Sequence, residues 1–136
     1  MLNLEPLAAL AANEMAGHDA TCANDAENII TKSLAVLAEQ GLYAFGLFLA
    51  TRRREQDAQP ARRIDAEARK LLNAAGLASE TQVRAPDMPT FYRSLTAAQG
   101  GESAAEALRR ILLSKQLLET TLTFGRYAAK ALKNEG

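Results

Sequence analysis

The chain has no tryptophan, one cysteine and one histidine, and these scarcities narrow its possible chemistry. A single cysteine cannot form an internal disulfide, which indicates a reducing compartment. His18 and Cys22 alone would leave a zinc site or a cysteine–histidine nucleophile without most of its groups. The sequence also contains no phosphate-binding glycine loop, dinucleotide-binding motif or metalloprotease motif. We therefore expect no enzyme activity, no catalytic residue, no metal site and no cofactor.

Net charge and long apolar runs are also missing. Sixteen basic and sixteen acidic side chains cancel, so no field of the whole protein attracts nucleic acid or an anionic membrane. Any polyanion binding must then come from a local patch or from assembly with other subunits. The apolar run 42–50 is too short for a bilayer, which needs about 20 residues, and the first residues lack the pattern of a secretion signal. We expect a cytoplasmic protein without membrane contact.

The residues that are abundant favour helices. Alanine and leucine dominate, and runs of β-branched residues are absent. A chain of 136 residues is long enough to bury one hydrophobic core without disulfides or metal. The sequence predicts an all-α fold, a single domain over residues 1–136. It should be a bundle of about five to six helices with a long C-terminal helix.

The stretch 24–54 carries the strongest helical pattern, with apolar residues at steps of three and four. Asn24 and Glu27 predict a capping box at its start. Gly41 and Gly46 each cost a helix about 1 kcal/mol relative to alanine, so we expect a bend or a close approach of another backbone. The prediction is a break at Gly41.

Proline, glycine and capping residues predict the other boundaries. Pro60 closes a polar linker, and Ser103 with Glu106 predicts a capping box before the longest helix. Pro86 and Pro89 lie in a predicted loop. The predicted helices cover residues 3–16, 25–39, 42–54, 61–75, 90–99 and 104–133, with connections at 17–23, 55–60 and 79–89.

Basic residues are the main candidates for a binding function. Arg52 to Arg54 end a predicted helix, where cations complement the helix dipole. Arg62-Arg63 begin the next predicted helix, where positive charge opposes the dipole. Arg126, Lys130 and Lys133 have a spacing that can follow a phosphate backbone and is equally normal for a solvated face. The candidate nucleic-acid-binding residues are Lys32, Arg52, Arg53, Arg54, Arg109, Arg126 and Lys130.

Two segments resemble a known family. Residues 34–48 contain Gln-Gly-Leu at 40–42, and residues 123–132 read Thr-Phe-Gly-Arg-Tyr-Ala-Ala-Lys-Ala-Leu. Together they resemble the signature of the small helical subunit of type III-B CRISPR effector complexes, the Cmr small subunit.

Some positions of these segments match the family, and others differ from it. Gly41, Leu42 and Phe48 match the family. Gln40 replaces an asparagine and Ala35 a proline, Gly125 stands where the family has a lysine, and the tryptophan of the C-terminal motif is absent.

The resemblance implies a non-catalytic subunit that stacks in several copies along the crRNA and target RNA beside other effector subunits. Its basic side chains would meet phosphates without reading sequence. Only Arg126 and Lys130 lie on the family's motif, and the other candidates come from the charge pattern. The alternative is a helical protein–protein interaction module or adaptor without nucleic-acid binding, whose basic clusters are solvated.

Overall fold

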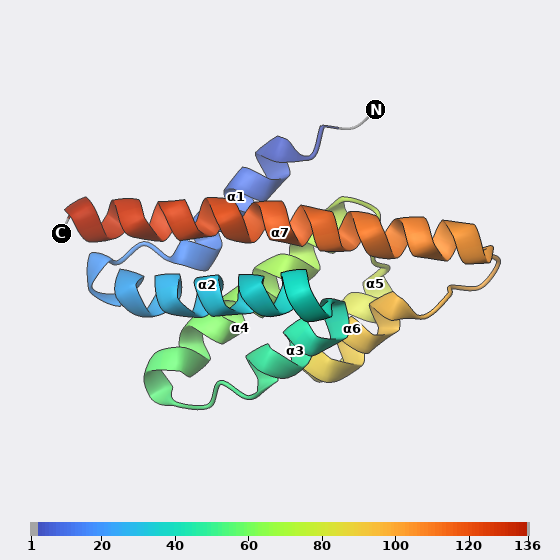
Figure 1. Cartoon of the computed structure of the whole chain (residues 1–136), viewed down its shortest axis with the longest axis horizontal. Helices are drawn as coiled ribbons and strands as arrows, with labels where there is room; N and C mark the ends of the chain where they lie inside the picture. Colours follow the sequence, from blue (N-terminus) through green and yellow to red (C-terminus); the bar gives the residue numbers. More distant parts are fainter. Residues whose placement is uncertain (1–2, 136) are drawn as a thin grey trace.

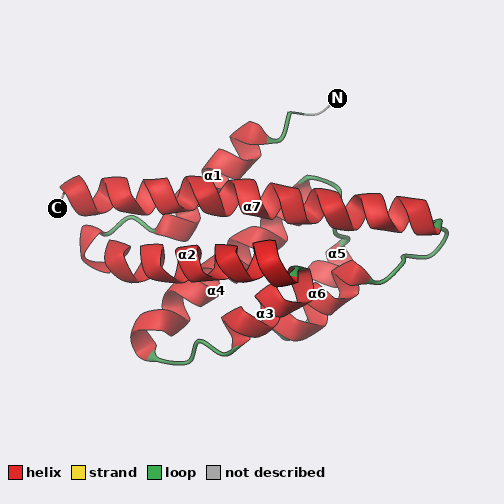
Figure 2. Cartoon of the chain, viewed as in Figure 1, coloured by secondary structure: helices red, strands yellow, loops and turns green. Residues whose placement is uncertain are grey.

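The computed structural model describes residues 3–135, and the regular structure of these residues is entirely helical (Figures 1 and 2). The all-α prediction and the long C-terminal helix are confirmed. In chain order the elements are α1 (Glu5–Ala16), a 3₁₀ turn η1 (Ala20–Cys22), α2 (Ala23–Gln40), α3 (Leu42–Ala50), α4 (Glu55–Ala74), α5 (Glu80–Val83), α6 (Met88–Thr96) and α7 (Ala104–Glu135).

Helix α7 runs along the whole molecule, and α1 and α2 pack against it more extensively than any other pair of helices packs (Figure 1). α3 packs mainly on α6, and α4 crosses below to reach α1 and α2. The first turns of α7 extend beyond the end of α2 (Figure 1). A continuous core of leucine, isoleucine, alanine and aromatic side chains lies between these helices.

The predicted break in the central stretch is present at Gly41. Its φ of 95° lies in the left-handed region, which glycine adopts without strain, and its N–H donates to the carbonyl of Leu37. The space where a Cβ would stand is empty, so the backbone conformation alone requires glycine here.

The predicted capping box of Asn24 and Glu27 is wrong. α2 begins at Ala23 and has no side-chain cap, because the 3₁₀ turn η1 leads directly into it. The carboxylate of Asp19 accepts from Thr21 N–H at 2.9 Å and caps that turn instead. Glu27 bonds to α7 rather than to its own backbone.

The predicted linker 55–60 is also wrong, because α4 begins at Glu55 and includes Pro60. Proline in a helix interior removes one backbone hydrogen bond and kinks the chain. Here Pro60 is buried beside Ala58 and Ala61, so tertiary packing of this face offsets the loss. Arg62-Arg63 therefore lie inside α4 and not at its start.

Three other boundaries differ from the prediction. α3 ends at Ala50 rather than at Arg54, and α6 ends at Thr96 rather than at residue 99. The predicted loop 79–89 contains α5 and the start of α6, because side chains cap both helices. The predicted capping box before α7 is confirmed: Glu106 N–H donates to Ser103 Oγ at 3.1 Å, and Ser103 N–H donates to the Glu106 carboxylate at 3.2 Å.

The contact between α3 and α6 is made by Tyr92 lying against Gly46. The ring centroid of Tyr92 is 5.3 Å from that of Phe45 and 4.8 Å from that of Phe91, both edge-to-face. A Cβ at Gly46 would stand 2.7 Å from Cβ and 2.5 Å from Cδ2 of Tyr92. The expected close approach is therefore present at Gly46, although a side chain rather than a backbone makes it.

Arg69 ties the segment around α5 to α4. Its Nη1 donates to the carbonyls of Val83 at 3.1 Å and Ala85 at 2.7 Å, and its Nε donates to Asp65 at 3.1 Å. The guanidinium also lies 4.8 Å from the ring centroid of Phe91. This partly buried arginine has a structural role.

Replacing Gly46 by alanine should destabilise the protein by about 1–3 kcal/mol, because the new methyl group overlaps the inner atoms of Tyr92. Gly125 is the matched control, since it is also helical but its Cβ would meet Ile30 at an ordinary 3.5 Å. Gly125→Ala should stabilise by up to about 1 kcal/mol through helix propensity. Urea unfolding measures both, and equal effects of the two substitutions would contradict this account.

Candidate nucleic-acid interface

The predicted basic residues do not form one surface. Lys32 is exposed on α2, and Arg109 is exposed in the second turn of α7. Arg126 lies 17 residues further along α7, which at the rise of an α-helix is about 25 Å from Arg109. One phosphate group cannot reach both. The structure instead brings together two groups: Arg126 with Lys130, and Arg52 to Arg54 at the connection between α3 and α4.

The group on α7 faces an internal carboxylate. Lys133 Nζ lies 2.8 Å from Glu27 Oε2, which joins the C-terminal end of α7 to α2. The hydrogen bond from Lys133 lowers the pKa of Glu27, and the charges of Lys133, Lys130 and Arg126 lower it further. The stripe Arg126, Lys130 and Lys133 thus has a negative partner within the same chain.

Arg110, next to the candidate Arg109, is committed to the fold. Its Nε donates to Glu102 at 2.8 Å, and its two Nη atoms donate to the carbonyls of Leu95 and Ala97, each at 2.7 Å. The hydrogen bond from Arg110, followed by that from Gln99 N–H, lowers the pKa of Glu102. Arg109 points to solvent, so of these two neighbours only Arg109 is available to a partner.

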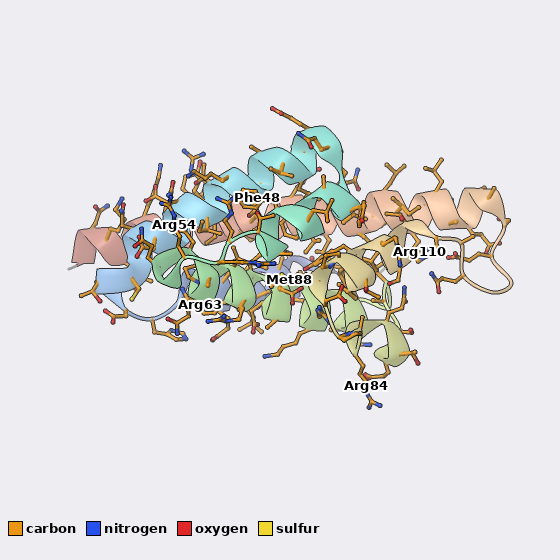
Figure 3. All side chains as sticks on the ribbon, turned by 90° about the horizontal axis from the view of Figure 1, so that it is seen from below. Phe48, Arg54, Arg63, Arg84, Met88 and Arg110 are labelled. Atoms are coloured by element: carbon orange, nitrogen blue, oxygen red, sulfur yellow. The ribbon has the colours of Figure 1, made fainter. Side chains whose placement is uncertain are left out.

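The connection between α3 and α4 places arginines close together. The Thr51 hydroxyl donates to Phe48 O at 2.7 Å and closes α3. Arg52 then stacks on Phe48, with its Cζ 4.6 Å from the ring centroid, and donates from Nε and Nη2 to Thr51 Oγ1. Arg54, in an extended conformation, leads into α4. Figure 3 shows Arg54 and Phe48 toward one end of the molecule, Met88 near its middle, and Arg84 and Arg110 toward the other end.

Arg62, on the exposed face of α4, completes this group. Together with Arg52 and Arg53 it lines a hollow of about 280 Å³, whose other lining residues are Leu49, Ala50, Ala58, Ala61 and Met88. Arg62 is not among the candidate residues predicted from the sequence, and the predicted start of a helix at residues 61–62 is wrong because α4 begins at Glu55. Its distance in sequence from Arg52 gives no signal of the contact.

The ion pairs of the described side chains lie away from the connection between α3 and α4. The ion pairs among the described side chains are Arg69–Asp65, Lys70–Glu67, Arg84–Glu80, Arg110–Glu102, Lys115–Glu119 and Lys133–Glu27, and His18 lies within hydrogen-bond distance of Glu14. None of these pairs includes an arginine between residues 52 and 63. The group formed by Arg52, Arg53, Arg54 and Arg62 is called the arginine corner below, and none of its members pairs with a described carboxylate.

Arg63, the neighbour of Arg62, points elsewhere. Its side chain packs under Gly17, where a Cβ would stand 3.2 Å from its Nη2. Its Nε and Nη2 are buried and have no hydrogen-bond partner among the described residues. Arg63 is therefore part of the contact between α4 and the turn after α1, and not of the arginine corner.

The two residues with chemical potential outside the basic groups do not form a site. His18 Nε2 lies 3.2 Å from the Glu14 carboxylate, and Cys22 is exposed beside Thr21. Among the described side chains of residues 3–135, no three histidine, cysteine or carboxylate groups gather as metal ligands would. In the same range no helix combines the length and apolar character needed to cross a bilayer.

No protein-family model matches the chain, and the searches of curated proteins and of solved structures found no match either. The family resemblance therefore stands on the two short segments described above. In the structure Gly41 and Leu42 form the junction of α2 with α3, and Phe48 carries the guanidinium of Arg52.

Replacing Glu27 by glutamine tests whether the α7 stripe has a structural role. The pKa of Glu27 is lowered in the folded protein, so its contribution is present above the unfolded pKa of about 4.3 and is lost as pH falls through the folded pKa. The variant should lose up to about 1 kcal/mol at neutral pH and nothing at low pH. Chemical unfolding at both pH values measures this, with the exposed Glu80→Gln as control. A loss that persists in acid would contradict the ion-pair explanation.

Proposed function

We propose that this protein is a non-catalytic small subunit of a type III CRISPR RNA-guided effector complex, which contacts the phosphate backbone of the crRNA and target RNA. The observation that carries the proposal is the arginine corner. It concentrates four arginines, none of them in an ion pair with a described side chain, in a protein whose total charge is zero. Such a cluster binds polyanions without reading base sequence.

The family resemblance supports the RNA-guided assignment. Its central motif covers the junction of α2 with α3 and reaches Phe48, four residues before Arg52. Its second motif includes Arg126 and Lys130, which face Glu27 in the isolated chain. In this proposal the arginine corner makes the main phosphate contact, and Arg126 and Lys130 chiefly stabilise α7 against α2.

Assembly explains how a neutral chain can bind RNA. A single arginine corner gives few phosphate contacts, so one copy should bind weakly and with a salt dependence that reflects only those contacts. Copies stacked along one RNA would add their contacts through effective concentration. The proposal includes a cytoplasmic location, other effector subunits and further copies of this chain as partners.

A second candidate function is a helical protein–protein interaction module without nucleic-acid binding. The exposed apolar side chains of α7 favour it. Leu108 is 57% exposed, Leu112 50% and Leu113 44%, and all three precede Lys115, whose Nζ donates to the Ala38 carbonyl near the end of α2. Apolar side chains grouped on one exposed stretch mark interaction surfaces. In an effector subunit the same side chains would meet a neighbouring subunit.

A tagged copy expressed at its native level in its own host should copurify with short guide RNAs and with the larger effector subunits. Sequencing of the bound RNA and mass spectrometry of the bound proteins measure this. A charge-neutralised variant, Arg53→Gln/Arg54→Gln, should reduce target-RNA binding of the assembled complex without releasing its protein partners. Recovery of protein partners without guide RNA would support the interaction module and exclude the effector subunit.

A further inference from the structure

We propose that the hollow between the end of α3 and the first turns of α4 binds a single phosphate group through Arg52, Arg53 and Arg62, and that this phosphate belongs to a phosphodiester of RNA. The site deepens the proposed function and rests on it only for the source of the phosphate. The shared chemistry, an arginine-bound phosphate, is independent of that source.

Arg52 is held in place by its neighbours. Its guanidinium is held from below by the Phe48 ring and from one side by Thr51 Oγ1, at 3.3 Å from Nε and 3.1 Å from Nη2. These contacts fix the planar group before a ligand arrives, so less side-chain entropy is lost on binding. Nη1 makes none of these hydrogen bonds and is available to donate to a phosphate oxygen.

Arginine side chains from two helices meet at the hollow. Arg52 and Arg53 follow the C-terminal end of α3, while Arg62 comes from the third turn of α4, and all three line the same hollow. Residues from separate elements that meet at one hollow can surround a tetrahedral anion in a way that one helix face cannot. Guanidinium groups suit such an anion because each can donate two parallel hydrogen bonds to it.

The rest of the hollow is apolar. The other lining side chains are apolar, and Leu49 and Ala61 are each only 1% exposed. A water-poor floor strengthens the attraction between a guanidinium and a phosphate. Among the described side chains that line the hollow, none is an aspartate or a glutamate.

The size of the hollow limits the ligand that it can bind. The volume of about 280 Å³ is just below the range of about 300–1,000 Å³ that holds drug-sized molecules. It accommodates a phosphate with part of its sugars and not a large cofactor.

The test uses the full-length protein and two probes, inorganic phosphate and a short oligouridine. Nuclear magnetic resonance follows the Nε–H signals of the arginines during each titration. We expect both probes to shift the signals of Arg52, Arg53 and Arg62, with the oligouridine binding more tightly. Failure of both probes to shift these signals at low salt would overturn the site. Shifts with inorganic phosphate alone would overturn its assignment to RNA.

The double variant Arg52→Gln/Arg62→Gln should bind the oligouridine about tenfold more weakly and reduce the salt slope of log K by about 1 to 2. The control Arg84→Gln/Lys70→Gln removes the same charge from side chains that do not line the hollow. Its affinity should stay within about twofold of the parent, and circular dichroism should show the same helix content in all proteins. Equal losses in the two double variants would overturn a localised site in favour of a diffuse charge effect.

A conservative substitution separates shape from charge. Arg52→Lys keeps the positive charge but removes the planar group that stacks on Phe48. It should recover less than half of the affinity lost in Arg52→Gln. Full recovery would overturn the prepositioned guanidinium.

The failure of this site is distinguishable from the failure of the proposed function. If guide RNA copurifies with the parent protein while Arg52→Gln/Arg62→Gln complexes bind target RNA normally, the hollow is excluded and the effector subunit stands. If the hollow binds both probes but no guide RNA copurifies, the site stands and the effector assignment is excluded.

Discussion

The position of the arginine corner depends on one packing contact deep in the protein, that of Tyr92 on Gly46. Because Gly46 has no side chain, the ring of Tyr92 lies directly against α3 and between Phe45 and Phe91. This contact fixes α6 on α3, and Met88, the first residue of α6, lies in the wall of the hollow. The α3 end that carries Arg52 is therefore positioned by a contact two turns away, on the buried side of the same helix.

Buried polar groups around Tyr92 extend the same arrangement to α4 and α5. Burial raises the pKa of the Tyr92 phenol well above its ordinary value, and the negative charge of Asp65 raises it further, so the phenol stays neutral. The Tyr92 hydroxyl has no hydrogen-bond partner of good geometry among the described residues, while Asp65 is held by Arg69. Arg69 in turn satisfies two carbonyls that follow or belong to α5, a helix of four residues too short to be stable alone. Arg69 is thus committed to joining local segments, whereas no described carboxylate pairs with the arginines of the α3–α4 connection.

Local sequence signals predicted those features that local chemistry determines. The helical class, the break at Gly41 and the capping box at Ser103 each follow from residue types within one or two turns. The errors occur where tertiary packing outweighs a local signal. Pro60 predicts the end of a helix, but burial of its face keeps it inside α4. Asn24 predicts a cap, but the preceding turn already leads the chain into α2. The same limit applies to the candidate site: Arg109 and Arg110 are equivalent in sequence, yet Glu102 and two carbonyls engage only the second.

The distribution of ion pairs turns a neutral chain into one with a local positive site. Basic residues on α7 that looked like a phosphate-binding stripe share Glu27, so a polyanion must compete with an internal carboxylate to reach them. At the proposed site, the described lining residues beside Arg52, Arg53 and Arg62 include no carboxylate. Screening limits the reach of charges to about 10 Å at 0.1 M salt, so the neutral total matters less to a bound phosphate than these immediate neighbours do. For this reason a zero net charge does not argue against the proposed RNA binding. The ion pairing of each individual arginine decides which arginines can contact a phosphate.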